Sequence, residues 1–126
     1  MAVLWIGLGS GLGGVARYLL ASSLMRLVGP AFPFGTLAVN AIGSFLVVLI
    51  MHVSIATGLI PPTVRLALTT GVMGGFTTYS TFTHETIALA ERGAWLLAGV
   101  NVLATVSLCL VSGALGLWAG RALAGS

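Results

Sequence analysis

Charge is what this sequence has least of. Only 6% of its 126 residues are charged and 58% are hydrophobic, whereas a soluble domain carries roughly 25% charged residues. Lys and Asp are absent, and the acids are Glu85 and Glu91. This composition argues against a soluble fold, and the thinly spread basic residues give no basic patch for nucleic acid. Those basic residues are Arg17, Arg26, Arg65, Arg92 and Arg121.

Groups suited to catalysis are also scarce. Cys109 is the single cysteine and lies in an apolar run, so it forms no internal disulfide and is interpreted first as a small buried hydrophobe. His52 stands alone, and His84 beside Glu85 lacks the spacing of a zinc site. No Ser-His-Asp or paired-carboxylate arrangement occurs. We therefore expect neither an enzyme nor an organic cofactor.

Glycine is abundant, with 18 residues, and follows two patterns. Gly9–Gly14 matches GxGxxG, but no acid precedes Glu85 and no βαβ unit surrounds the motif, so close helix packing explains it better than a dinucleotide site. Small residues four apart let membrane helices approach closely, within one subunit or between two. Such pairs are Gly7/Gly11, Gly9/Gly13, Gly71/Gly75 and Gly116/Gly120.

Long apolar runs are the main feature present. A membrane helix needs about 20 such residues, so this chain has room for four or five spans and little else. We predict one all-α transmembrane domain, 1–126, of antiparallel helices joined by short connections. Gly, Pro and Arg punctuate spans at roughly 2–26, 34–57, 64–91 and 95–120.

The arginines give no clear orientation in the membrane. With four spans, Arg26 and Arg92 lie on one side, and Arg65 and Arg121 lie on the other. Cytoplasmic loops normally carry the excess of basic residues. This balance favours an antiparallel, dual-topology dimer, although loops this short can also conceal a real bias.

The third span contains its own interruption. Its middle, Gly71-Val-Met-Gly-Gly-Phe-Thr-Thr78, combines three glycines and two threonines, which form helix poorly. A broken helix at membrane depth needs protein or a polar cavity to satisfy its backbone groups. Its unwound carbonyls can coordinate a cation, and half-helix N-termini favour anions. We interpret the break as a candidate ion site.

Rings and hydroxyls follow the break. Tyr79 and Phe82 project to nearly the same face, beside Thr78, Ser80 and Thr81. Ring edges suit an anion and ring faces a cation. Hydroxyls replace part of an ion's hydration without a fixed charge that would trap it. The alternative is that the rings pack and the hydroxyls bond their own helix.

Polar residues also occur in the first two spans. Thr36, Asn40 and Ser44 are four apart and share one helix face, where they either join helices or line a narrow polar path. Arg17 lies within the first span, where an arginine is costly. It either lines a wet vestibule that attracts anions or snorkels to the membrane interface.

Together these segments resemble the CrcB/Fluc family of fluoride channels over essentially the whole chain. The resemblance rests on motifs in family order and spacing, with Glu85 three residues beyond the last of them. The motifs are Gly13-Gly-Val-Ala-Arg-Tyr18, Gly35-Thr-Leu-Ala-Val-Asn-Ala-Ile-Gly-Ser-Phe45 and Gly74-Gly-Phe-Thr-Thr-Tyr-Ser-Thr-Phe82.

The resemblance implies a dual-topology homodimer that exports fluoride passively through two antiparallel pores in a prokaryotic plasma (inner) membrane. It implies a structural Na⁺ at the dimer centre, held by the backbone carbonyls of Gly74 and Thr77 where each third helix breaks. Arg17 would lie near the vestibule and Glu85 at the far end of the polar track. The implied pore residues are Thr36, Asn40, Tyr79, Ser80, Thr81, Phe82, Thr105 and Cys109.

Three positions depart from the family pattern. Tyr79 stands where Phe is usual, Cys109 replaces a hydroxyl, and Asn101 occupies a place where an aromatic residue is common. Two other functions were weighed. A small multidrug exporter needs an acid in its first helix, which here has none, and a structural subunit of a membrane complex would not conduct by itself.

Overall fold

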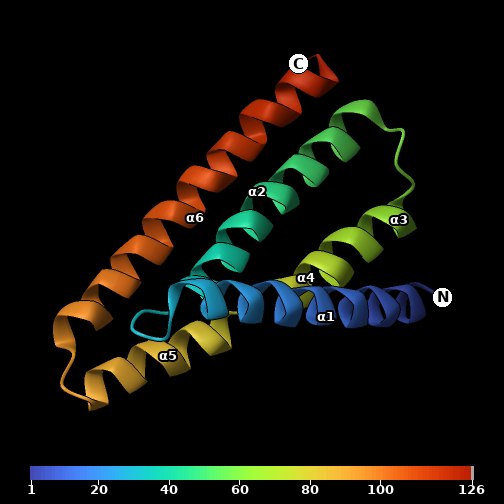
Figure 1. Cartoon of the computed structure of the whole chain (residues 1–126). Coiled ribbons are helices and arrows are strands. Elements are labelled where there is room, and N and C mark those ends of the chain that lie inside the picture. The colour runs from blue at the N-terminus through green and yellow to red at the C-terminus, as the bar shows by residue number, and fades with distance from the viewer. Residues whose placement is uncertain (126) are drawn as a thin grey trace.

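The computed structural model describes residues 1–125, and these residues are helical without any strand. The predicted all-helical fold is therefore confirmed. Four helical regions succeed one another along the chain, and the third is made of several pieces (Figure 1). The elements are α1 (Ala2–Val28), α2 (Phe34–Thr57), α3 (Pro62–Leu66), η1 (Ala67–Met73), α4 (Gly74–Phe76), α5 (Tyr79–Glu91) and α6 (Trp95–Ala124).

Glycine and proline set the helix ends. Gly29, with φ 85°, follows α1, and Gly58, with φ 64°, follows α2 in the left-handed conformation that a residue without Cβ adopts at little cost. Pro62 then begins α3, where its missing N–H would have had no helical partner. The glycines and prolines between the predicted spans thus end and begin helices through their backbone conformations.

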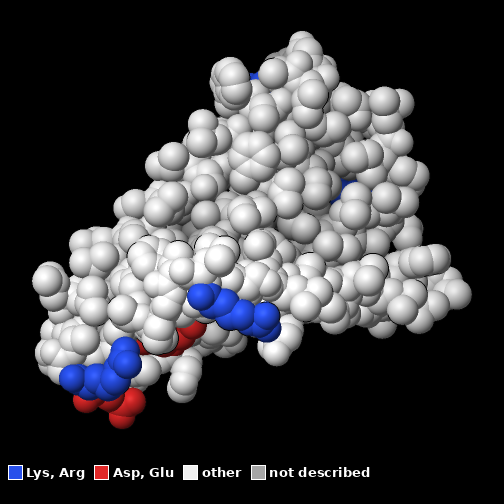
Figure 2. Space-filling view, in the orientation of Figure 1, with Lys and Arg blue, Asp and Glu red and all other residues white. Residues whose placement is uncertain are grey.

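Within residues 1–125, three helices are long and apolar enough to cross a membrane: α1, α2 and α6. Much of their surface carries exposed Leu and Val side chains, such as Leu12, Leu103 and Leu110. Figure 2 shows a largely uncharged face, on which the blue and red atoms gather mostly over α5 and the neighbouring part of α1. Exposed apolar surface of this extent fits lipid better than water.

The most extensive packing joins alternate helices, not consecutive ones. The helix α6 packs mainly on α2, and α1 packs on η1 and α4. The helices α2 and α6 are the second and fourth helical regions of the chain, and they run in the same direction (Figure 1). The expectation of antiparallel neighbours therefore holds only for the lesser contacts, α1 with α2 and α5 with α6.

Glycines allow these close approaches. A Cβ at Gly13 would collide with the Val72 carbonyl oxygen, and one at Gly116 would collide with the Phe45 carbonyl oxygen. The predicted glycine pairs therefore differ in what they pack against. A Cβ at Gly7 or Gly11 would have no atom within 4 Å, so this pair makes no close contact within the subunit. Gly9 and Gly71, like Gly13, Gly75, Gly116 and Gly120, pack within the subunit.

The third region changes its winding twice. It is α-helical from Pro62, becomes a π-helix over Ala67–Met73, and returns to a single α-helical turn in Gly74–Phe76. Thr77 and Thr78 are extended, and a new helix begins at Tyr79. Wide π-turns are rare and often accompany functional sites. The interruption separates η1 and α4 from α5.

We expect Gly13→Ala to destabilise the protein by about 1–3 kcal/mol, because the added methyl group must displace backbone of η1. Gly7→Ala is the matched control in the same helix, since its methyl group meets open space. Thermal unfolding in detergent would measure both variants. Equal melting temperatures for the two would contradict this packing.

Candidate functional site

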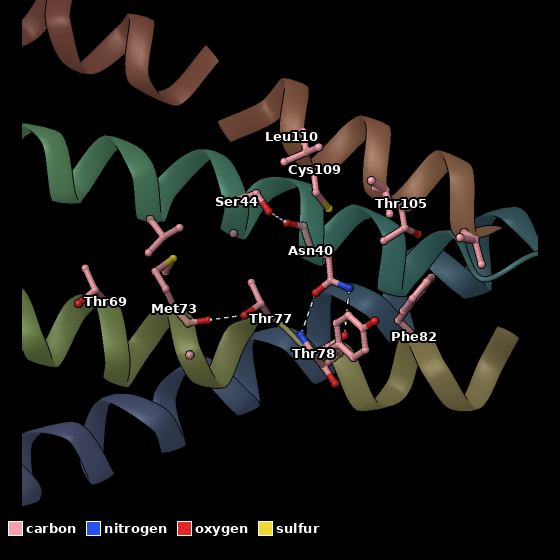
Figure 3. A pocket seen from close by; sticks show the side chains of 16 residues that line it. Asn40, Ser44, Thr69, Met73, Thr77, Thr78, Phe82, Thr105, Cys109 and Leu110 are labelled. Carbon is pink, nitrogen blue, oxygen red and sulfur yellow. Dashed lines mark hydrogen bonds between the residues drawn. The ribbon is translucent and has the colours of Figure 1, made fainter. Parts of the chain in front are cut away.

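The break between α4 and α5 is held by the side chain of Asn40. Thr77 has φ −87° and ψ 157°, and Thr78 has φ −151° and ψ 113°. The Thr78 N–H donates to Asn40 Oδ1 at 2.8 Å, and Asn40 Nδ2 donates to the Thr78 carbonyl at 3.0 Å (Figure 3). One amide therefore satisfies both backbone groups of Thr78, as a neighbouring strand would.

Two residues of α1 support the break from the other side. Arg17 Nε donates to the Gly75 carbonyl at 3.0 Å, and Ser10 Oγ donates to the Gly71 carbonyl at 3.4 Å. Gly75 is in the last turn of α4, where carbonyls lose their helical partners and carry partial negative charge. The guanidinium of Arg17 thus caps the negative end of a half-helix.

Thr78 caps the next helix. Its Oγ1 accepts the N–H of Thr81 at 3.2 Å, which satisfies one of the first amides of α5. The same hydroxyl donates to Thr81 Oγ1 at 2.9 Å. Thr78 therefore ends the extended segment and begins α5, so its backbone and side chain both have structural roles.

A cavity of about 660 Å³ opens beside the break. It collects residues of α2, the third region and α6 (Figure 3). None of its lining residues carries a charge, although several carry a hydroxyl, amide or thiol group. Seven of the predicted site residues line this cavity: Asn40, Gly74, Thr77, Tyr79, Phe82, Thr105 and Cys109.

The two rings meet edge to face but differ in exposure. Their centroids are 5.5 Å apart and their planes cross at 69°. Phe82 is 8% exposed, whereas Tyr79 is 79% exposed. Phe82 therefore belongs to the wall of the cavity, and Tyr79 lies at its outer margin.

A second cavity, of about 260 Å³, lies on the other side of the Asn40–Thr78 pair. Its lining brings together Arg17, Thr36, Thr81 and Glu85, all of them predicted site residues. Glu85 Oε1 is buried without a hydrogen-bond partner. Thr78 lines both cavities, so the break is the place where they adjoin.

The structure divides the predicted polar stripe of α2. Thr36 faces the smaller cavity, whereas Asn40 and Ser44 face the larger one. Ser44 Oγ donates to the Asn40 carbonyl of its own helix at 2.7 Å, which is the local bonding weighed as the alternative. Ser80 is exposed and lines neither cavity.

Three polar residues with defined contacts were not among the predicted site residues. The sequence places Thr78 among the hydroxyls beside the rings, and a Thr just before a helical segment is also a helix-start signal. Asn101 is 2% exposed and donates to Thr86 Oγ1 at 2.9 Å. No local sequence pattern pairs Asn101 with Thr86, because the two lie on different helices.

The break offers carbonyl oxygens to a cation. In a continuous helix the Thr78 N–H would bond the Gly74 carbonyl, but here it bonds Asn40. Gly74 and Thr77 both line the larger cavity. Residues 1–125 contain no group of three or more His, Cys, Asp or Glu able to hold a metal. Unwound backbone carbonyls of this kind coordinate hard cations in some membrane transporters.

These features define a multi-pass helical membrane protein with an uncharged, largely apolar cavity beside a broken helix, into which several polar side chains face. Residues 4–117 match the family described as CrcB-like protein, Camphor Resistance (CrcB). The chain therefore belongs to the CrcB family, as the resemblance predicted.

Three relatives share the name Fluoride-specific ion channel FluC. The protein of Sorangium cellulosum (strain So ce56) is 50% identical over 119 residues, 94% of each chain. That of Pelobacter propionicus (strain DSM 2379 / NBRC 103807 / OttBd1) is 54% identical, over 88% of this chain and 86% of its own. That of Geobacter sulfurreducens (strain ATCC 51573 / DSM 12127 / PCA) is 52% identical, over 94% and 92%.

We expect Asn40→Ala to loosen the break, because it leaves two backbone groups of Thr78 without partners at about 1–3 kcal/mol each. Amide hydrogen exchange of the peptide containing Thr78 should become faster, and the melting temperature should fall. Ser44→Ala is the control, since its hydroxyl bonds only its own helix. Unchanged exchange in Asn40→Ala would show that Asn40 does not hold the break.

Proposed function

We propose that this chain is a fluoride-specific ion channel, which carries fluoride passively across a bacterial membrane and so relieves its toxicity. The relatives named as such channels match nearly the full length of the chain. The observation that carries the proposal is the pair of adjoining cavities, one charged at its margin and one neutral, which meet at Thr78. A channel changes no bond of the ion, so we propose no enzymatic activity.

The neutral cavity suits a small anion that must bind and leave. The Ser and Thr hydroxyls of its lining already donate their hydrogens to protein acceptors. The donors that remain to replace part of the hydration shell of an anion include the ring edges and the Asn40 amide. A fixed positive charge would hold fluoride too tightly for rapid passage, and the lining of the larger cavity contains none. Asn40 keeps a second Nδ2 hydrogen beyond the one it donates to Thr78. That hydrogen is the donor we assign to the permeating ion.

The smaller cavity serves as the entrance. Arg17 uses Nε on the Gly75 carbonyl, so its terminal nitrogens remain to attract anions. Thr36 and Thr81 then supply hydroxyls toward the break, and Glu85 lies at the end of this track. Ser80 is exposed in a single subunit and joins the path only where a second subunit covers it.

A single subunit does not enclose a pore, and we propose the antiparallel homodimer for this reason. Tyr79 is 79% exposed beside the larger cavity, and Gly7 and Gly11 form a free close-packing surface on α1. The balanced arginines allow both orientations in the membrane. Cross-linking of cysteines introduced at Gly11 in liposomes would test it, since a monomer would give no cross-linked product.

The proposed Na⁺ site depends on this dimer. Gly74 and Thr77 of one subunit supply two carbonyls, and a second copy related by an axis through the break would supply two more. The ion would hold the two breaks together without entering the anion path. Diffraction after exchange of Na⁺ for Tl⁺ tests the site, because anomalous density away from these carbonyls would rule it out.

The other two functions have less support. An exporter driven by protons needs an acid in the first helix, and α1 contains Arg17 but no Glu or Asp. A structural subunit would not conduct when purified alone. Both alternatives are decided by the same flux measurement.

The purified protein in liposomes loaded with fluoride should release it once valinomycin removes the opposing potential. A fluoride electrode measures the release, and a chloride electrode measures the matched experiment with chloride. We expect fluoride efflux at a rate at least about a hundredfold above chloride, which corresponds to about 2.8 kcal/mol of selectivity. Absent fluoride efflux, or chloride efflux of equal rate, would refute the proposed function.

Phe82→Leu should lower the fluoride rate about three- to tenfold, because a ring edge contributes about 0.5–1.5 kcal/mol beyond its packing and Leu has no edge. The matched control is Ile87→Leu on the same helix, at a side chain that is 55% exposed. Size-exclusion chromatography confirms that both variants assemble. A wild-type rate in Phe82→Leu would remove Phe82 from the path.

A further inference from the structure

A partly buried chain of hydrogen bonds connects α6 to the backbone that carries Phe82. Asn101 Nδ2 donates to Thr86 Oγ1 at 2.9 Å, and Thr86 Oγ1 donates to the Phe82 carbonyl at 2.7 Å. Asn101 is 2% exposed, so water does not compete for its amide. The hydroxyl of Thr86 thus receives one hydrogen bond and gives another, and it transmits the position of Asn101 to the turn that begins at Phe82.

The orientation of α5 depends on side-chain contacts more than that of the longer helices. It has 13 residues and is separated from α4 by two extended residues, so helix continuity does not fix its rotation about its own axis. Its most extensive packing is on α6, with little on α2. Thr78 holds the first turn through its cap. The Asn101–Thr86 bond holds the middle of the helix against α6.

The other end of the Asn101 amide reaches the cavity wall. Thr105 Oγ1 donates to Asn101 Oδ1 at 3.4 Å, and Thr105 lines the larger cavity opposite Phe82 (Figure 3). One side chain thereby connects the α5 wall and the α6 wall of the same cavity. The Asn101 side chain thus contacts one residue of the lining, Thr105, directly and acts on a second, Phe82, through Thr86.

We propose that Asn101 is a positioning residue, which acts through Thr86 to fix the rotation of α5 and hence the direction in which the Phe82 ring edge faces the ion path. This inference rests on the proposed fluoride channel. It assigns to Asn101 no contact with the ion. The same hydrogen bonds predict that the effect of Thr86 on fluoride conduction depends on its hydroxyl oxygen and not on the volume of its side chain.

The test compares unitary fluoride currents of single channels in planar bilayers, because unitary current reports only on channels that folded and inserted. Thr86→Val keeps the shape but removes the hydroxyl, and Thr86→Ser keeps the hydroxyl. Asn101→Leu removes the donor from the other side. The matched control is Thr83→Val, since Thr83 Oγ1 also bonds a carbonyl of α5, that of Tyr79, but is exposed.

We expect Thr86→Val and Asn101→Leu each to lower the unitary current about fivefold, the change that corresponds to about 1 kcal/mol for one hydrogen bond. The double variant should be no worse than either alone, and Thr86→Ser and Thr83→Val should conduct like the wild type. In the liposome efflux measurement described above, the fraction of liposomes that release fluoride should change little in all variants.

Three results would overturn the inference while leaving the fluoride channel intact. These are wild-type unitary current in Thr86→Val and Asn101→Leu, a loss in Thr86→Ser equal to that in Thr86→Val, and fewer active channels with unchanged unitary current. The last would make Asn101 a purely structural residue. A wild-type protein without any fluoride current would instead refute the proposed function itself.

Discussion

The pairing of Asn40 with Thr78 is the interaction on which the rest of the structure depends. Inside a membrane, a backbone group without a partner costs several kcal/mol, so a helix cannot simply stop there. Asn40 supplies a donor and an acceptor 38 positions away in sequence. The third region can therefore turn at Thr77 and Thr78, and this turn places the carbonyls of Gly74 and Thr77, the cap of Thr78 and the ring of Phe82 around one point.

The same pairing explains why the site is rich in hydroxyls and poor in charge. An amide satisfies the break without adding a charge, and the hydroxyl of Thr78 caps α5 without one. The extended segment and the start of α5 are thus stabilised by neutral polar groups, whereas the end of α4 accepts a hydrogen bond from the guanidinium of Arg17. A break held by a carboxylate would repel an anion, and one held by an ammonium group within the lining would retain it.

The sequence predicted the fold class and the interruption of the third helix, because composition and glycine content act locally. It grouped Tyr79 and Phe82 but did not predict their exposure, which is 79% for Tyr79 and 8% for Phe82. It treated Gly7/Gly11 and Gly9/Gly13 alike, since spacing does not tell which face meets another helix. Asn101 and Thr86 were missed because their contact exists only after α5 packs on α6. The roles of the lining residues in conduction stay predictions.

Arg17 shows how a charge is accommodated near such a site. A charged side chain within a membrane helix pairs with another charge or with backbone carbonyls, and Arg17 does the latter by donating to the Gly75 carbonyl at the C-terminal end of α4. The half-helix exists only because the third region breaks, so the break that forms the neutral cavity also creates the partner for the charge beside it. The Gly75 carbonyl thereby compensates part of the positive charge, and Glu85 lies in the lining of the same cavity. As the proposed entrance, this cavity would attract fluoride without holding it as an unpaired guanidinium would, which is what passage into a cavity without charge requires.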